Sequence, residues 1–319
     1  MNRPTVQLYP DSGRQTTDRR LKVANASRIP AFVNPKSGNF EGARTALEQA
    51  GSFDIREVDP EKLHDGIRDA IESGATRILV AGGDGSIRTG ARAIRGSKCE
   101  LAVLPAGTLN HFAKDHGIPV DLLKAAEAAG GQITIAIDAG SVGDTIFLNT
   151  SSIGAYVTFM RVRERLEKRF GYRLASLIAA IRTFIIMPSI TVELETDGRT
   201  VTYTTPLVFI GVGERELQVP KLGSRVENGR RGLHVIIVRG RRKARLLAVV
   251  LAAVSRGVKT AATAPELDSF IVERCTITMR RRVVAVALDG EQEIMKSPLE
   301  YRLERDILRV VSSGETRGT

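Results

Sequence analysis

The stretch ILVAGGDGSIRTGARAI, residues Ile78–Ile94, runs from four apolar residues through three closely spaced glycines around one aspartate into a mixed pattern. The apolar run Ile78–Ala81 does not alternate with polar residues, which predicts a strand covered on both faces, as in a parallel sheet. After the glycines, Ile87, Ala91 and Ile94 recur at helical spacing. The stretch therefore predicts a strand, a glycine turn and a helix in direct succession.

The glycine turn, Gly82–Ser86, suits a bound phosphate. A strand that turns into a helix points backbone N–H groups and a helix N-terminus at an anion. The glycines let the chain turn tightly and let a phosphate approach the main chain, and Ser86 is placed to cap the helix. A bare carboxylate at Asp84 would repel a phosphate unless a divalent cation lay between them. We therefore predict a Mg-nucleotide site here, with Asp84 as the metal ligand.

Length and composition indicate an ordinary globular protein. The chain has 319 residues, enough for a large core and two domains, with 42% hydrophobic and 26% charged residues. Its two cysteines, Cys99 and Cys275, do not belong to a Cys/His cluster. This pattern favours a reducing cytosol and argues against a disulfide framework or a structural zinc.

Positive charge is unevenly distributed along the chain. The net charge is +11, and basic residues gather in residues 1–28, Arg161–Arg182, Arg239–Arg245 and Arg280–Arg282. Such patches attract anionic surfaces, either acidic lipids or nucleic acid. The alternative is a solvated basic face that keeps the protein soluble.

Sequence hydropathy predicts no membrane span. Leu246–Val254 is too short, and Leu177–Pro188 is interrupted by Arg182 and ended by Pro188. The first residues lack an apolar signal core, so export is not expected. We expect a cytoplasmic protein that associates peripherally with an anionic membrane surface.

The pattern of elements changes twice along the chain. Residues 1–28 are polar, basic and unpatterned, which predicts a mobile tail. Across 29–138 strands alternate with helices, which predicts a three-layer α/β domain with a parallel sheet. From 139 to 300 strand signals dominate, with turn residues between them, which predicts a mostly antiparallel sandwich or open barrel.

Four short motifs follow one another in order. They are NPKSG (Asn34–Gly38), GGDGS (Gly82–Ser86), PAGTLN (Pro105–Asn110) and LDGE (Leu288–Glu291). GGDGS alone is also similar to turns of phosphofructokinases and NAD kinases. In this combination the chain resembles the diacylglycerol kinase catalytic family, which includes bacterial lipid kinases and sphingosine kinases. The resemblance covers nearly the whole chain after residue 28.

The resemblance implies a fold and an activity. The fold is a three-layer nucleotide domain related to phosphofructokinase and NAD kinase, followed by a β-sandwich domain for the lipid. A late segment, 301–312, is expected to return to the first domain as a strand. The activity is transfer of the γ-phosphate of ATP, with Mg²⁺, to a lipid hydroxyl. Diacylglycerol is the default acceptor, and sphingoid bases, ceramide and other lipid alcohols stay open.

The resemblance also implies which residues form the site. Around the nucleotide it places Asn34, Asp59, Gly82, Gly83, Asp84, Gly85, Ser86, Thr108 and Asn110. Asp289 and Glu291 fall at the catalytic acidic pair, with Glu291 as the proton acceptor. If the strand ending at Leu288 continued, both carboxylates would face one side, whereas a turn would present both to the cleft. Taken alone, the LDGE motif is typical of an ordinary hairpin turn.

Several neighbours of these motifs have two interpretations. Thr108 either caps a helix, with Asn110 exposed, or contacts the nucleotide, which the resemblance favours. Loop histidines such as His111 and His116 are more often surface groups than catalysts. Lys36 is equally well a phosphate ligand or a solvated lysine.

One turn departs from the family pattern. Bacterial members hold a structural magnesium around an Asp-Gly-Leu turn, but the corresponding turn here reads RRGLHV, with Arg231 in place of the aspartate. A guanidinium is a donor only and does not ligate a cation. We therefore do not expect this second metal site.

An apolar stripe marks the segment 172–186. It consists of Leu174, Leu177, Ile178, Ile181 and Ile185 at helical spacing. The favoured interpretation is a core helix packed on the sandwich. The alternative is a membrane-facing helix, supported by the basic residues Arg161–Arg173 just before it.

Two other functions compete with a lipid kinase. A soluble kinase acting on a nucleotide or a sugar would share the glycine turn, but the sugar-kinase signature GTIDND is absent from the sequence. A non-catalytic binder of nucleic acid or anionic lipid would explain the charge and leave the acidic turns unexplained. The chain has no Trp for base stacking, so no specific nucleic-acid partner is expected.

Overall fold

The computed structural model describes residues 28–108, 110–186, 189–196, 198–216, 225–226, 228–238 and 267–314. The predicted basic tail lies outside these residues except for Arg28. The basic segment Arg239–Arg245 and the apolar segment Leu246–Val254 also lie outside them.

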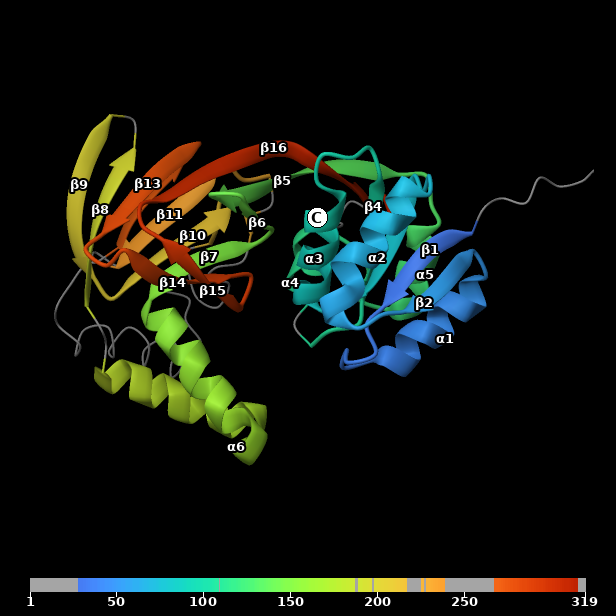
Figure 1. Cartoon of the computed structure of the whole chain (residues 1–319), viewed down its shortest axis with the longest axis horizontal. Coiled ribbons are helices and arrows are strands. Elements are labelled where there is room, and N and C mark those ends of the chain that lie inside the picture. Colours follow the sequence, from blue (N-terminus) through green and yellow to red (C-terminus); the bar gives the residue numbers. More distant parts are fainter. Residues whose placement is uncertain are drawn as a thin grey trace, which may run out of the picture.

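The first part of the chain is a parallel α/β layer structure, as predicted. Its strands are β1 (Ile29–Val33), β2 (Phe53–Glu57), β3 (Arg77–Gly82) and β4 (Glu100–Pro105), in the order β2-β1-β3-β4. Its helices are α1 (Phe40–Ala50), α2 (Pro60–Glu72), α3 (Asp84–Ile94), α4 (His111–Asp115) and α5 (Leu122–Ala129). The strands pair in parallel, and helices cover the sheet (Figure 1).

Alternating residues of the parallel strands build two cores. Ile78 and Val80 of β3 pack into the cluster that contains residues of α2 and α3. Leu79 and Ala81 of the same strand pack into the cluster that contains residues of α1 and α5. The uninterrupted apolar run is therefore explained by burial on both faces of β3.

The later part of the chain is a β-sandwich. One sheet is antiparallel and contains β7 (Thr150–Gly154), β10 (Leu207–Val212), β11 (Leu233–Val238), β12 (Leu267–Val272), β14 (Val283–Leu288) and β15 (Glu291–Lys296). The facing strands are β5 (Thr134–Val142), β6 (Thr145–Phe147), β8 (Ile190–Thr196), β9 (Arg199–Thr205), β13 (Arg274–Met279) and β16 (Leu299–Val311). One apolar cluster fills the space between them, with side chains such as Val286 and Ile277 from the two sides.

Two long strands run from the sandwich into the α/β part. β16 pairs with β13 at one end and, in parallel, with β4 at Val310 and Leu101 at the other. β5 follows β16 antiparallel along its length, with a register shift between Glu304 and Leu308. The first sheet therefore continues through both parts, and Figure 1 shows β16 as the long red arrow between them. The predicted domain division at residues 138 and 139 stays a prediction.

The helical segment α6 (Ala155–Ile186) projects away from the sheets (Figure 1). It is kinked at Gly171, whose φ of 70° interrupts the helix. Leu174, Leu177 and Ile181 are 47%, 57% and 53% exposed, while the small side chains of Ala175 and Ala179 are buried. The favoured prediction of a core helix is therefore wrong for these three leucine and isoleucine side chains. Among the described helices, none is long and apolar enough to cross a membrane.

Candidate functional site

Two glycine turns lie directly against each other at the carboxyl ends of β3 and β4. A Cβ added to Gly107 would lie 2.4 Å from the Cα of Gly83, so a side chain does not fit there. A Cβ on Gly82 would lie 2.6 Å from Oγ of Ser86. The close approach of the two backbones therefore requires a glycine at Gly107, and the position of the Ser86 side chain requires one at Gly82.

Asp84 joins these two turns. Its Oδ1 accepts a hydrogen bond from the Phe112 backbone N–H at 2.9 Å, and its Oδ2 accepts one from His111 N–H at 3.1 Å. These amides belong to the N-terminus of α4, where backbone N–H groups lack helical partners and favour a negative charge. Asp84 thus fixes the loop that follows β4.

Asn110 shapes the same loop from within. Its backbone has a φ of 50°, in the left-handed region. Its Nδ2 donates to the carbonyls of Pro105 and Gly107 at 3.2 and 2.9 Å, and its Oδ1 accepts from Gly107 N–H at 3.0 Å. Both amide donors of the side chain are used inside the loop, so its predicted contact with a nucleotide stays a prediction.

The motif NPKSG adds a third loop to this edge. Asn34 Nδ2 donates to Ser86 Oγ at 3.0 Å, and Asn34 Oδ1 accepts from Lys36 N–H at 2.8 Å. Lys36 Nζ pairs with Asp59 at 3.0 Å, and both side chains are exposed. Ser86 was predicted to cap α3, which is wrong because Gly83 is the N-cap and Ser86 lies inside the helix.

The structure therefore gathers the predicted nucleotide residues at one edge. Thr108 is exposed there, and a Cβ on Gly38 would lie 3.9 Å from its Oγ1. Asp59 follows β2 and precedes α2. The loops after all four parallel strands meet where ligands bind in open α/β sheets.

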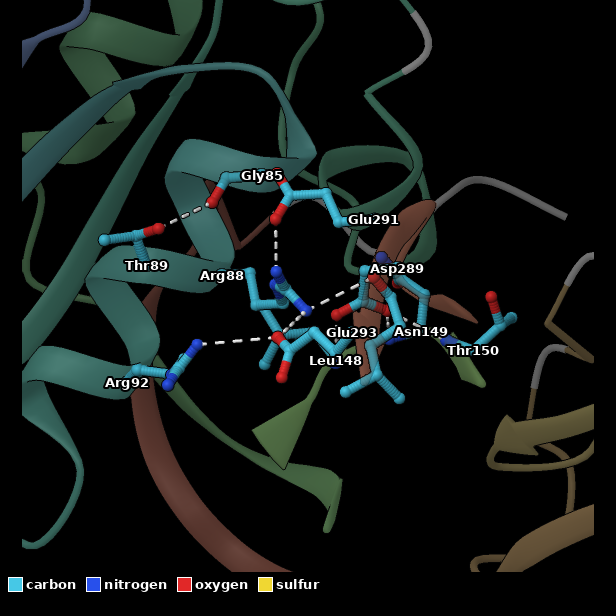
Figure 2. A network of polar contacts seen from close by, with 11 residues as sticks. Gly85, Arg88, Thr89, Arg92, Leu148, Asn149, Thr150, Asp289, Glu291 and Glu293 are labelled. Carbon is cyan, nitrogen blue, oxygen red and sulfur yellow. Dashed lines mark hydrogen bonds and ion pairs between the residues drawn. The ribbon is translucent and has the colours of Figure 1, made fainter. Parts of the chain in front are cut away.

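Asp289 and Glu291 are separated by a tight hairpin. β14 ends at Leu288 and β15 begins at Glu291, so Asp289 and Gly290 form a two-residue turn, with φ values of 48° and 86°. This answers the alternative that the sequence left open: the strand does not continue. The two carboxylates diverge from the turn toward different partners (Figure 2).

The Asp289 carboxylate is enclosed and faces the backbone. It accepts hydrogen bonds from the N–H groups of Leu148, Asn149 and Thr150 at 2.7, 2.7 and 3.0 Å. Burial raises the pKa of Asp289, and the three amide donors and nearby Arg88 oppose part of this rise. With three donors on its two oxygens, this carboxylate holds the hairpin against the β6–β7 connection.

The Glu291 carboxylate reaches back to the α/β part. Its Oε2 accepts a hydrogen bond from Nη2 of Arg88 (Figure 2). Its Oε1 lies so close to Gly85 that a Cβ added to that glycine would be only 2.3 Å from it. The side chain is 54% exposed, so a reactant can approach it. A carboxylate therefore lies against the GGDGS turn, in position to act on a group bound there.

Sequence reasoning missed Arg88. Its side chain is 4% exposed, and its Nη1 donates to Leu288 O at 3.3 Å and to Glu293 Oε1 at 3.1 Å. The available signal was a basic residue one turn into the helix after GGDGS. Together with Glu291 and Glu293, which share a face of a strand, it could have suggested an ion pair.

The two histidines of the loop region differ in their surroundings. His111 is exposed at the start of α4. His116 packs against Phe112 with ring centroids 4.6 Å apart and the ring planes tilted by 45°, and its Nε2 lies 3.5 Å from Nη1 of Arg225. Burial, together with the positive charges of Arg225 and Arg215, lowers the pKa of His116 to about 3. His116 is therefore neutral near pH 7, and its side chain is partly buried.

Arg231 takes the place of a cation between two carboxylates. Its Nε donates to Asp138 Oδ2 at 2.8 Å, its Nη2 also bonds Asp138 Oδ1, and Nη2 donates to Asp306 Oδ1 at 2.8 Å. The Asp306 backbone N–H donates to Asp138 as well. Because a guanidinium already neutralises both carboxylates, these residues do not fit the second magnesium of the family.

The donor set at the glycine turn fits a metal that arrives with a nucleotide. Among the described residues, no three His, Cys, Asp or Glu side chains gather as a metal cage. Mg²⁺ commonly takes one or two protein carboxylates and completes its shell with phosphates and water. A single carboxylate at Asp84, within the GGDGS turn predicted to bind phosphate, matches that pattern.

Proteins with similar sequences are named as lipid kinases. A protein of Pseudomonas syringae pv. tomato named "Probable lipid kinase YegS-like" is 37% identical over 156 residues, which cover 45% of this chain and 50% of that protein. A diacylglycerol kinase of Staphylococcus carnosus is 23% identical over 199 residues, 62% of this chain and 60% of that protein. The chain thus spans about half the length of the first of these curated relatives.

Solved structures share the fold across most of the chain. A diacylglycerol kinase from Bacillus anthracis has a TM-score of 0.64 at 16% identity, covering 90% of this chain and 97% of that one. A second structure from the same organism has a TM-score of 0.70 at 19% identity, with coverage of 90% and 98%. At the sequence level, residues 28–142 match the family described as diacylglycerol kinase catalytic domain. Residues 28–142, which contain the glycine turns and the loops around them, therefore belong to the diacylglycerol kinase catalytic domain family.

Proposed function

We propose that this protein is an ATP- and Mg²⁺-dependent lipid kinase that phosphorylates a lipid hydroxyl, with diacylglycerol as the first acceptor to test. The observation that carries the proposal is the Glu291 carboxylate, which the β14–β15 hairpin holds against Gly85 of the phosphate-binding turn. The names of the relatives support a lipid acceptor. The family match supports a kinase.

The residues divide the work of phosphoryl transfer. Backbone N–H groups of Gly82–Ser86 bind the phosphates, and Asp84 is the carboxylate that would hold a Mg²⁺ carried by ATP. When bound, the metal neutralises charge on the phosphates. The lipid oxygen forms a bond to the γ-phosphorus, the bond from that phosphorus to the β–γ bridging oxygen breaks, and ADP leaves. Glu291 accepts the hydroxyl proton during this step.

Asp289 acts on the site through the backbone. Three amides surround its carboxylate, so it is not in position to contact an acceptor. It fixes the hairpin from which Glu291 projects. In this proposal Glu291 is the proton acceptor and Asp289 holds the turn.

The projecting helix α6 supports a lipid surface as the place of reaction. Phe170, Leu174, Leu177 and Ile181 expose apolar side chains along it. Exposed basic residues accompany them: Arg161, Arg165, Arg169 and Arg182. An apolar stripe flanked by cations matches an anionic membrane, where the stripe enters the headgroup region. The helix base is tied to the catalytic hairpin, because Arg161 Nε donates to Gln292 Oε1 at 2.7 Å.

Transfer of labelled γ-phosphate from Mg-ATP to diacylglycerol in detergent micelles tests the proposal. We expect label in the lipid product, and we expect Glu291→Gln to lower the rate by about 10²-fold or more, the range for a lost general base. Glu300→Gln is the matched control, since Glu300 is an exposed carboxylate that contacts Arg302 on its own strand. Label confined to the aqueous phase would indicate a soluble acceptor, and failure to bind ATP would overturn the kinase assignment.

A further inference from the structure

Arg88 connects the phosphate-binding helix to the catalytic hairpin. It lies four residues after Asp84 in α3, so its guanidinium is anchored to the same helix that follows the GGDGS turn. Through that guanidinium it bonds Glu291, Glu293 and the carbonyl of Leu288, all from the β14–β15 hairpin. Figure 2 shows the guanidinium between the two glutamates. Residues 200 or more positions apart in the chain thus form one polar cluster.

Burial excludes a direct role for Arg88 in binding phosphate in this arrangement. The side chain is 4% exposed, whereas the Glu291 side chain that it holds is half exposed. A buried charge is costly unless it is paired, so the guanidinium requires its carboxylate partners. The arginine therefore acts on the site by fixing a carboxylate that itself stays accessible.

Gly85 completes the arrangement. A Cβ at this position would lie 2.3 Å from Glu291 Oε1, so the missing side chain leaves the space that the carboxylate occupies. The carboxylate is thereby held between a backbone contact on the phosphate turn and a guanidinium one turn further along α3. Helix α3 therefore sets the distance between the Glu291 carboxylate and a phosphate group bound at the GGDGS turn.

We propose that Arg88 is a positioning residue that sets the place of Glu291 relative to the phosphate-binding turn. The inference rests on the proposed function, in which Glu291 accepts the proton of the acceptor hydroxyl. Phosphoryl transfer depends on aligned reactants, and a misplacement of about 1 Å can cost about 10²-fold in rate. Arg88 supplies this alignment from α3, the helix that begins at the turn proposed to bind the ATP phosphates.

The test compares Arg88→Gln and Arg88→Lys with the wild type in the micelle assay. We expect Arg88→Gln to lower kcat by about 10²-fold with the KM for ATP changed less than about 2-fold. Arg88→Lys keeps the charge but loses the planar fork, so it should recover part of the loss. Arg92→Gln is the matched control, because Arg92 lies one turn further along α3 and, among the described residues, pairs with Glu293 alone, at 3.7 Å.

A double substitution separates positioning from general damage to the fold. If Arg88 acts through Glu291, adding Arg88→Gln to Glu291→Gln should lower kcat no further. An equal loss in both backgrounds, or a faster reaction of Arg88→Gln alone, would overturn the inference. The faster reaction would mean that the pair restrains Glu291 instead of placing it.

A double-mutant cycle in thermal unfolding uses the wild type, Arg88→Gln, Glu291→Gln and the double variant, and it needs no substrate. It distinguishes failure of the positioning role from failure of the lipid-kinase function. Coupling between Arg88 and Glu291 in thermal unfolding, without phosphate transfer to any lipid, would overturn the lipid-kinase function and with it the catalytic part of this inference. Lipid phosphorylation by the wild type, without coupling between the two residues, would overturn the positioning role alone.

Discussion

Asp289 and Glu291 carry the same chemical group two residues apart, and their surroundings give them different tasks. The turn directs Asp289 into three backbone N–H groups, which occupy both of its carboxylate oxygens. It directs Glu291 to Gly85 and Arg88, where one side of the carboxylate stays accessible. In the proposed function, direction and solvation therefore separate a structural acid, Asp289, from a reactive one, Glu291.

The three amide bonds of Asp289 predict a stability effect. Asp289→Asn keeps the size of the side chain but replaces an acceptor oxygen by a donor, so at least one backbone N–H loses its partner. The free energy of unfolding should fall by about 2 kcal/mol, the cost of an unsatisfied buried group. Urea unfolding followed by circular dichroism measures it, with Glu300→Gln as the control. Equal stability of the two variants would contradict the role assigned to Asp289.

At the scale of elements, the strands β5 and β16 meet the loop before β11 at one charged cluster. Asp138 lies on β5, and Asp306, with a φ of 50°, lies where the register of β16 shifts. Arg231 reaches both from just before β11. The cluster therefore ties the sandwich to the two strands that continue into the α/β part.

This cluster predicts how stability depends on pH. Burial alone raises the pKa of Asp138, but hydrogen bonds from Arg231 and the Asp306 amide outweigh burial and leave the pKa below its ordinary value. The folded pKa is thus below the unfolded value of 3.8, so the pair stabilises the fold above that value. The contribution is lost as pH falls through the folded pKa.

Arg231→Gln should lower the melting temperature at pH 7 by about 2–4 °C and flatten the fall in stability on the acid side. Melting curves from neutral pH down to about pH 2 measure both effects. Arg302→Gln serves as the control, because Arg302 is exposed on β16 and pairs with Glu300. An unchanged acid limb in Arg231→Gln would show that other carboxylates dominate it.

The same cluster predicts the response to chelation. Since Arg231 supplies the positive charge between Asp138 and Asp306, no divalent cation is needed there for folding. EDTA added to nucleotide-free protein should therefore change the melting temperature by less than about 1 °C, because a ligand stabilises only where it binds. A drop of several degrees that Mg²⁺ restores would reveal a structural metal site that this arrangement does not contain.

Elements with strong local signals were predictable from the sequence. The apolar run Ile78–Ala81 predicted β3. Burial of this run on both faces of the sheet explains why none of its four residues is polar. The apolar stripe around Leu177 correctly predicted a helix with one apolar face. Periodicity does not indicate whether that face packs on the protein or is exposed. Its outward orientation depends on how α6 leaves the sandwich, which is a property of the packed molecule.

Tertiary contacts decided what the local pattern left open at the site. Two-residue spacing did not distinguish a continued strand from a hairpin at Asp289, because the turn is fixed by amides of the β6–β7 connection. Arg88 escaped notice for the same reason, since its partners lie 200 or more residues away. The motifs located the site, while the arrangement within it came from packing.

At the scale of the whole molecule, three features align around the hairpin. The GGDGS turn lies on one side of Glu291, and the base of α6 contacts the next residue, Gln292, on the other. The N-terminal half of α6 packs on β14 through Val157, Met160 and Ala287. In the proposed function, a helix in contact with a membrane would thus be mechanically continuous with the strand pair that presents the proton acceptor.

This arrangement predicts a separation of membrane binding from chemistry. Replacing Leu174, Leu177 and Ile181 together by serine should lower binding to vesicles of phosphatidylglycerol and phosphatidylcholine by at least about 10-fold, because each buried leucine or isoleucine contributes about 1.5–3 kcal/mol. Activity toward diacylglycerol in detergent micelles should stay within about 2-fold, since the stripe is remote from the reacting groups. Co-sedimentation and the micelle assay measure the two quantities on the same protein.

The control for this experiment is Val201→Ser, which removes an equally exposed apolar side chain from β9 on the sandwich. Binding of the wild type should weaken in high salt, because exposed arginines of α6 contribute attraction to anionic lipid. If the triple variant binds vesicles as well as the wild type, the stripe does not enter the membrane. If micelle activity also collapses while the fold is intact, the stripe lines the path of the acceptor, and docking and chemistry are one function of α6.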